Sequence, residues 1–202
     1  HRGPDDKGSY FDHLSGIGLG HRRLSIIDTS SLGHQPMKSK DEKVVLVFNG
    51  EIYNYKRLRS ELIEKGFIFR GNSDTEVLLN LYLYEGESML QRLEGIFAFA
   101  IWDSQKKLLF IARDALGVKP LYYYISQDNC FAFASELKAL LYLVPDKREL
   151  DFLSLHRYLS FLWCPGRGTP IKSFFKLQPG EAIIVNEGHI QKRWMWYQLP
   201  SF

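Results

Sequence analysis

Four short apolar segments between residues 95 and 135 constrain the fold more than any other part of the sequence. They read IFAFAIWD, KLLFIARD, PLYYYIS and CFAFAS, and stretches of turn-forming residues at 103–107, 115–119 and 127–129 separate them. Apolar runs of this length, bounded by turn residues, are typical of β-strands. The spacing therefore predicts an antiparallel meander of adjacent strands over residues 96–135.

Helical patterns are interspersed with these strands. Tyr55, Leu58 and Leu62 recur at the spacing of a helix over residues 54–65. Ser73 and Glu76 have the spacing of a capping box, which predicts a second helix over residues 74–85. Because strands and helices do not alternate strictly, we predict an α+β fold in which helices cover stacked antiparallel sheets. If the chain contains a joint between a main body and a C-terminal appendage, the sequence places that joint near residue 145, in the stretch VPDKREL.

Composition excludes several classes of protein. The 202 residues carry a net charge of +3 without a basic run of five or more, so nothing indicates binding to nucleic acid or to an anionic membrane. No segment reaches the roughly 20 apolar residues of a membrane span. The two cysteines, Cys130 and Cys164, lack metal-site spacing and are too few for a disulfide scaffold. We therefore expect a cytoplasmic protein.

The stretch VVLVFNGEIYN, residues 44–54, allows two interpretations. Asn49-Gly50 after an apolar run is a strong signal for the turn of a β-hairpin, because both residues tolerate positive φ. The same pair can instead present a side-chain amide and a bare backbone N–H to a ligand. Local sequence alone favours the hairpin turn.

Three polar clusters interrupt apolar surroundings, at 21–25, 49–51 and 72–74. Each has an ordinary explanation as a solvated strand, a turn or a helix cap. Together they supply a guanidinium for a carboxylate, a carboxylate for an ammonium, and amide donors for a carbonyl oxygen. This set suits a free α-amino acid with an amide side chain, because a desolvated zwitterion needs a partner at both ends.

The order of the motifs resembles a known family. HRGPD, HRRLSIID, GHQPM, FNGEIYN, GNSDTE, LEGIFAFAIWD, ARDALGVKPLYYY and FASELKAL occur in the order of the glutaminase domain of glutamine-hydrolysing asparagine synthetases, a branch of the class II glutamine amidotransferases. The resemblance covers residues 1–200. It implies the fold of the N-terminal-nucleophile hydrolases, with two stacked antiparallel β-sheets between α-helix layers.

The resemblance also implies a role for each matching residue. Asn49 and Gly50 would form an oxyanion hole, Asp74 would hold the α-ammonium of glutamine, and Glu51 would lie beside the substrate. The site for the α-carboxylate would comprise Arg23 and the backbone of Leu24, Ser25, Ile26 and Ile27. No metal and no cofactor are expected in this domain. The Asn-Gly pair is then a turn whose donors face the substrate.

The nucleophile of the family is a cysteine at the first position of the mature chain, with its own α-amine as base. Residues 1–202 do not include it, and Cys130 and Cys164 are internal; we expect Cys130 to be a buried strand residue. The missing N-terminal segment would carry the nucleophile, so we expect the parent protein to hydrolyse glutamine and these residues alone to be inactive.

The expected partners are glutamine and a following synthetase domain of the same chain, which would use ATP and Mg²⁺ to convert aspartate to asparagine with the released ammonia. A homodimer is left open. The alternative hypothesis is a non-catalytic module that binds glutamine or serves as a docking surface.

Overall fold

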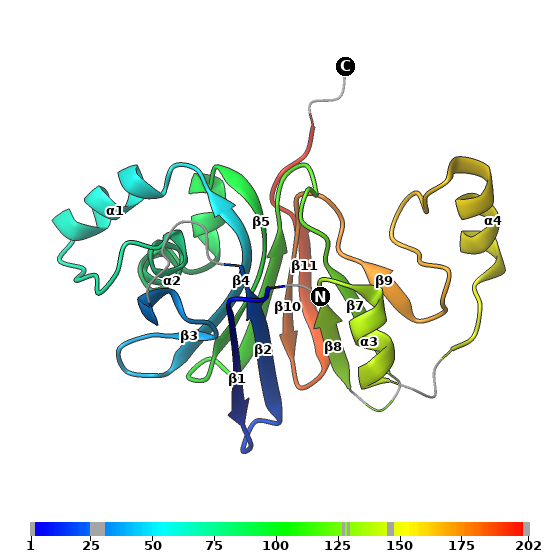
Figure 1. Ribbon diagram of the computed structural model, residues 1–202, viewed down its shortest axis with the longest axis horizontal. Helices are drawn as coiled ribbons and strands as arrows, with labels where there is room; N and C mark the ends of the chain where they lie inside the picture. Colours follow the sequence, from blue (N-terminus) through cyan, green and yellow to red (C-terminus); the bar gives the residue numbers. More distant parts are fainter. Residues whose placement is uncertain (1–2, 25–30, 127, 129, 145–147, 200–202) are drawn as a thin grey trace. The chain divides into compact units, whose positions relative to one another are not determined.

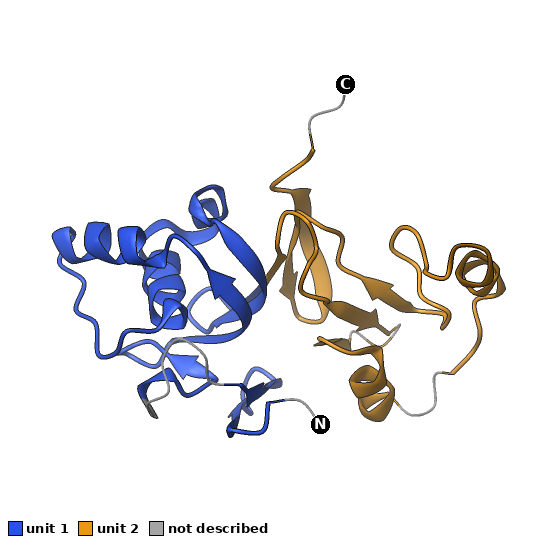
Figure 2. Ribbon diagram, turned by 45° about the horizontal axis from the view of Figure 1, so that its top comes forward, with its two compact units in different colours: residues 1–110 blue, residues 111–202 orange. Residues whose placement is uncertain are grey.

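The computed structural model describes residues 3–24, 31–126, 128, 130–144 and 148–199. The chain divides into two compact units, residues 1–110 and 111–202 (Figure 2). The boundary predicted near residue 145 is therefore not where the structure divides. None of the described helices is long and apolar enough to cross a membrane.

The first unit combines short antiparallel strands with two helices (Figure 1). Its elements are β1 (Asp6–Asp12), β2 (Ile17–Arg23), the 3-10 helix η1 (Ser31–Gly33), β3 (Met37–Lys38), β4 (Val44–Ile52), α1 (Tyr55–Glu64), α2 (Asp74–Glu85), the 3-10 helix η2 (Gly86–Arg92) and β5 (Gly95–Asp103). Strands β1 and β2 form a hairpin, and β4 pairs along its length with β5 and at its start with β3.

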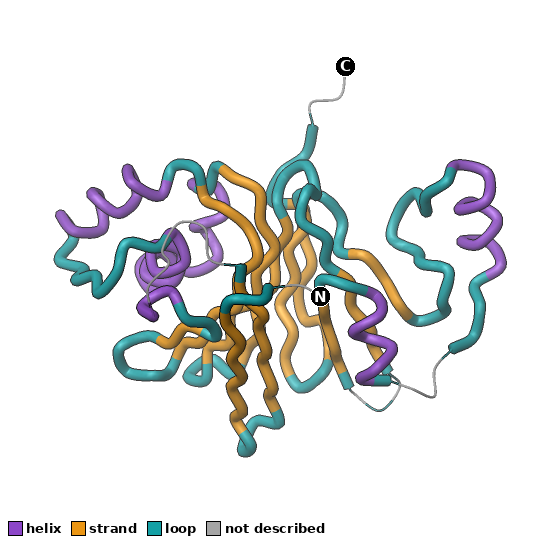
Figure 3. Tube along the Cα trace, in the orientation of Figure 1, coloured by secondary structure: helices purple, strands orange, loops and turns teal. Residues whose placement is uncertain are grey.

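The second unit is also mixed in secondary structure (Figure 3). Strand β6 (Leu108–Arg113) begins just before the division, and the following elements are β7 (Tyr122–Ile125), β8 (Phe131–Ala134), α3 (Leu137–Leu143), α4 (Phe152–Phe161), β9 (Phe174–Lys176), β10 (Glu181–Asn186) and β11 (His189–Met195). The α+β prediction is confirmed, since every sheet pairing within the two units is antiparallel.

The predicted meander over residues 96–135 is only partly correct. Strands β7 and β8 form the expected antiparallel hairpin, but the other edge of β7 pairs with β9, so β6 cannot be its neighbour. The stretch FIFR, residues 67–70, has the apolar pattern of a short strand but has no regular structure. Cys130 is exposed rather than buried, because it lies just before β8, where its N–H donates to the Ser126 hydroxyl.

Helices α1 and α2 lie on one side of the sheet in the first unit (Figure 1), as predicted: α2 packs against β4, and α1 packs against α2. Their inward-facing leucines are almost completely buried, including Leu58 and Leu62 of α1 and Leu78 and Leu81 of α2. The predicted start of α2 is confirmed, because the Ser73 hydroxyl accepts the Glu76 N–H at 3.2 Å. This cap fixes where Asp74 enters the unit.

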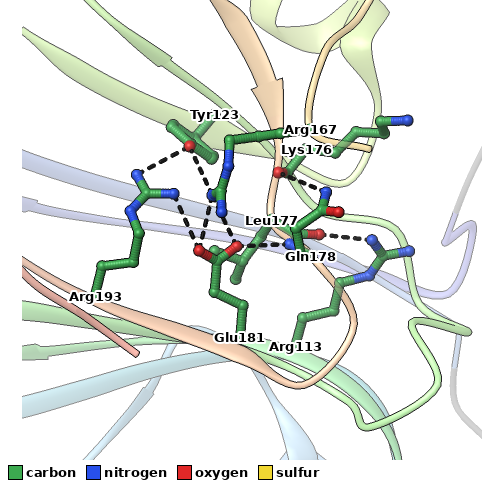
Figure 4. Close-up of polar contacts among 8 residues, drawn as sticks. All are labelled: Arg113, Tyr123, Arg167, Lys176, Leu177, Gln178, Glu181 and Arg193. Atoms are coloured by element: carbon green, nitrogen blue, oxygen red, sulfur yellow. Dashed lines mark hydrogen bonds and ion pairs between the residues drawn. The ribbon is translucent and has the colours of Figure 1, made fainter. Parts of the chain in front are cut away.

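One buried carboxylate organises the second unit (Figure 4). Glu181 is 1% exposed, and its oxygens accept hydrogen bonds from Arg167, Arg193 and the backbone N–H of Gln178. Both guanidinium groups also donate to the Tyr123 hydroxyl, at 3.3 and 3.0 Å. Burial is the main cause that raises the pKa of Tyr123 to about 12. Each polar group in this cluster has a partner within the unit, so we interpret the cluster as a structural network.

Close approach of β4 and β5 depends on Gly95. A Cβ there would overlap the Glu51 carbonyl oxygen and lie 3.0 Å from Cα of Ile52. We expect Gly95→Ala to lower the free energy of unfolding by about 1–3 kcal/mol, the usual cost of overpacking. Gly20→Ala is the control, because its Cβ would meet nothing closer than 4.0 Å. Urea denaturation measures both, and equal stability of the two variants would contradict this packing.

Candidate functional site

Hydrogen bonds alternate between the two edges of β4. The odd-numbered residues face β5: the Tyr53 N–H donates to the Glu94 carbonyl at 2.7 Å, and the Lys43 carbonyl accepts the Ser104 N–H at 2.9 Å. In an antiparallel pair, the residues between such bonded positions point their N–H and C=O groups away from the partner strand. The even-numbered residues of β4 therefore face the opposite edge.

Different groups occupy that opposite edge along the strand. The Val44 N–H donates to the Ser39 hydroxyl, and the Val44 carbonyl accepts the Ser39 N–H. Strand β3 pairs with β4 at the next even-numbered position, Leu46. Beyond the end of β3, side chains replace a neighbouring strand. Gln35 occupies the position at Phe48, and Asp74 occupies the position at Ile52.

Gly50 is the even-numbered position between these two. Among the described residues, none forms a hydrogen bond with Gly50 on this edge. By the alternation of the strand, its N–H is directed to the same edge as those of Phe48 and Ile52. The edge of β4 thus offers one donor between two occupied positions.

Asn49-Gly50 is not a turn. Both residues lie inside β4, opposite Ala98 and Phe97 of β5, so the hairpin interpretation and the expectation of a substrate-facing turn are both wrong. The glycine is required for close approach instead. A Cβ at Gly50 would overlap the Ile96 carbonyl oxygen and lie 2.7 Å from Cα of Phe97.

The side chains beside Gly50 are partly accessible. Residues Val44–Phe48 are buried, whereas Asn49 is half-buried and Glu51 is exposed. No described residue forms a hydrogen bond with the Asn49 side chain. Alternate residues of a strand project to the same face, so Asn49 and Glu51 present an amide and a carboxylate side by side.

Asp74 is 5% exposed and joins α2 to β4. Its Oδ2 accepts the Ile52 N–H at 3.0 Å, and its Oδ1 accepts the Thr75 N–H at 2.9 Å. Burial raises the pKa of Asp74 above its ordinary value, and the nearby charge of Glu51 raises it further. The hydrogen bonds from the Ile52 and Thr75 N–H groups lower the pKa and offset part of this rise. A cation at this position would relieve the cost of burying the carboxylate.

Asp74 binds the Ile52 N–H, so the structure brings it to the strand that contains Asn49, Gly50 and Glu51. Arg23 ends β2, whose His21 contacts β4 at Phe48.

The Arg23 guanidinium packs on Gly33, where a Cβ would overlap it. Leu24 is exposed, and Ser25, Ile26 and Ile27 lie outside the described residues. The expectation that Arg23 and Asp74 bind the same substrate stays a prediction.

Two residues at this edge were not predicted as part of the site. Gln35 is 5% exposed and binds both backbone groups of Phe48. His21 Nε2 lies 3.0 Å from the Phe48 carbonyl oxygen, which only accepts, so Nε2 carries the proton. His21 Nδ1 is buried, and none of the described residues forms a hydrogen bond with it. The only signal in the sequence was their position within motifs shared with the resembled family.

Comparisons with known proteins place these features in context. A family model described as a glutamine amidotransferase domain matches residues 1–196. Asparagine synthetase [glutamine-hydrolyzing] 1 of Bacillus subtilis is 44% identical over 185 residues, which cover 92% of this chain and 28% of that protein. Asparagine synthetase [glutamine-hydrolyzing] 3 of the same organism is 37% identical over 203 residues, covering 99% of this chain and 32% of that protein.

A solved structure shows the same fold. Glutamine phosphoribosylpyrophosphate amidotransferase from B. subtilis, complexed with ADP and GMP, superposes with a TM-score of 0.64 at 24% identity, covering 90% of this chain and 35% of that one. The chain thus spans about a third of the length of these relatives.

Burial of His21 makes stability depend on pH. Burial lowers the pKa of His21 below 6.5, so below about pH 6.5 the unfolded state binds a proton that the folded state resists. The free energy of unfolding should fall with acidification by at most about 1.4 kcal/mol per pH unit from this group. Urea denaturation between pH 7.5 and 5.5 measures this free energy, which should change less with pH in His21→Gln than in His156→Gln, where the substituted histidine is exposed. The same slope in both would contradict the assignment.

Proposed function

The chain belongs to the glutamine amidotransferase domain family and has the N-terminal-nucleophile hydrolase fold, and we propose that it binds free glutamine along the open edge of β4 and hydrolyses its side-chain amide to glutamate and ammonia. Asn49 and Gly50 would stabilise the reacting carbonyl, while Asp74 and Arg23 would hold the amino-acid end. Relatives named as glutamine-hydrolysing favour this over the non-catalytic alternative.

The spacing along β4 is the observation that supports glutamine most directly. Asp74 binds at Ile52, two residues from the open donor at Gly50. Two residues of a strand span about 7 Å. In glutamine, four bonds of about 1.5 Å separate the α-nitrogen from the side-chain carbonyl carbon, and the oxygen extends one bond further. A ligand of this length reaches from the buried carboxylate to the Gly50 N–H.

The donors suit an oxygen whose charge grows during the reaction. Attack on the amide carbon moves an electron pair onto the carbonyl oxygen, and preorganised N–H donors stabilise the resulting anion. The Gly50 N–H is held by the strand, and the Asn49 amide lies beside it. We propose that the attacking group is the N-terminal cysteine that the resemblance implies, with its α-amine as base. Glutamine hydrolysis would then need no metal and no cofactor.

The amino-acid end needs charged partners. Asp74 is a buried carboxylate that keeps two backbone N–H bonds and still has lone pairs for an ammonium. A carboxylate has two oxygens with about four acceptor sites, so the substrate ammonium adds to these bonds without replacing them. Arg23, at the end of the strand that contacts Phe48, would take the α-carboxylate, for which a planar guanidinium is well suited.

The whole protein would pass the ammonia to a second domain. Because the chain spans about a third of its relatives, we propose that a synthetase domain of the same polypeptide uses the ammonia, with ATP and Mg²⁺, to convert aspartate to asparagine.

Helix α4 offers a surface for such a domain. Seven large apolar side chains between 152 and 163 are 46–83% exposed: Phe152, Leu153, Tyr158, Leu159, Phe161, Leu162 and Trp163. An exposed apolar patch of this kind marks an interaction site.

Substitution on α4 tests this partner. In the full-length protein, Leu159→Asp should lower asparagine formation from glutamine by on the order of 10-fold while glutamine is still hydrolysed, because a charge would be buried between the domains. Leu14→Asp is the control, since Leu14 is fully exposed in the β1–β2 turn. Product assays for glutamate and asparagine measure the ratio, and equal ratios in the two variants would exclude this surface.

Two substitutions separate binding from catalysis. In the protein with its complete natural N-terminus, Asp74→Asn should mainly weaken glutamine binding, because the amide keeps the shape but loses the charge. Asn49→Ala should lower kcat by on the order of 100-fold, as loss of one oxyanion donor does, with a smaller change in KM. The ammonium is charged throughout the reaction, whereas the oxyanion exists only near the transition state.

Steady-state glutaminase kinetics measure both effects. Asn186→Ala, in the hairpin between β10 and β11, is the matched control for loss of an asparagine side chain and should behave as wild type. A normal kcat for Asn49→Ala would remove Asn49 from the oxyanion hole.

A further inference from the structure

We propose that Gln35 is a positioning residue that aligns the oxyanion-hole segment of β4; this inference rests on the proposed function. Gln35 Oε1 accepts the Phe48 N–H at 2.7 Å, and Nε2 donates to the Phe48 carbonyl at 3.1 Å. The side chain is almost completely buried, so water does not compete for these bonds. A single amide thereby makes both hydrogen bonds that a neighbouring strand would make to Phe48.

A side chain is needed at this point because the strand beside β4 has ended. Strand β3 pairs only through Met37 and Lys38, opposite Leu46 and Val45. Continuing β3 alongside β4 would cover the Gly50 donor. Gln35 instead secures Phe48 and leaves the next even-numbered position open. Gln35 therefore supports this edge of β4 at Phe48 and leaves the edge accessible at Gly50.

The Phe48 carbonyl controls the position of the next residue. This carbonyl and the Asn49 N–H belong to one planar peptide group, so fixing the oxygen fixes the plane from which the Asn49 side chain starts. His21 Nε2 donates to the same oxygen at 3.0 Å, which uses its second lone pair. Both acceptor sites of this carbonyl are therefore held by buried or half-buried side chains.

Gly50 makes external support necessary. Glycine has more backbone freedom than any other residue, yet an oxyanion donor must be aimed within a few tenths of an ångström. On one side of Gly50, Gln35 holds Phe48, and on the other side Asp74 holds Ile52. With both flanking positions fixed, the peptide groups of Gly50 cannot rotate independently. Loss of Gln35 should therefore misalign the donor more than it weakens glutamine binding.

Gln35→Met tests the proposal, because methionine keeps the length and apolar volume but makes neither bond. Ser39→Ala is the matched control: the Ser39 hydroxyl, also buried, accepts the Val44 N–H at 3.0 Å on the same edge of β4, far from Gly50. In the full-length protein, we expect Gln35→Met to lower kcat for glutamine hydrolysis by about 10-fold or more, with KM changed less than about threefold. Ser39→Ala should keep kcat within about twofold.

Amide hydrogen exchange provides a readout that does not need activity. The Asn49 N–H faces β5, and its exchange should accelerate by about 10-fold in Gln35→Met but not in Ser39→Ala. A kcat within twofold of wild type in Gln35→Met, or equal losses in the two variants, would overturn the proposal. If the wild-type protein hydrolyses no glutamine, the proposed function fails. Exchange at Asn49 then decides alone whether Gln35 positions this segment, and unchanged exchange rejects it.

Discussion

The arrangement of the site depends on the alternation of hydrogen bonds along β4. Odd-numbered residues bond with β5, and even-numbered residues face the other edge, where β3, Gln35 and Asp74 each occupy a position. An unpaired edge normally invites another strand. Here the edge is occupied on both sides of one residue, and no described residue bonds with the Gly50 N–H there, which is why we propose this donor as the position for a small ligand.

The same edge connects the strand to the helix layer. The Ser73 cap sets the first turn of α2 and delivers Asp74 into a buried position, where its carboxylate reaches the Ile52 N–H. Burying a carboxylate is costly, and the two N–H bonds offset only part of this cost, since its pKa remains raised. A substrate ammonium would complete the compensation. Packing of α2 on β4 and the proposed recognition of an amino acid therefore both depend on Asp74, which the Ser73 cap positions.

Sequence patterns located these parts but not their arrangement. The capping signal at Ser73 and the helix periodicity were local and were correct. Asn49-Gly50 was misread as a turn because its glycine is needed for a contact with Phe97, a residue distant in sequence. Apart from its place in the motif GHQPM, Gln35 carried no signal, since one buried side chain that replaces a strand leaves no periodicity. The meander failed at β7 because its partner β9 comes some 50 residues later.

A direct test of this account is the response of the Gly50 amide to the reaction product. The side-chain carboxylate of glutamate would sit where the oxyanion forms, so in the full-length protein labelled with ¹⁵N, titration with glutamate should shift the Gly50 backbone amide and the Asn49 side-chain amide together. The Val45 amide, which faces β5 near the start of β4, should not move. Saturable binding of glutamate without any shift at Gly50 would contradict the assignment of this edge as the substrate site.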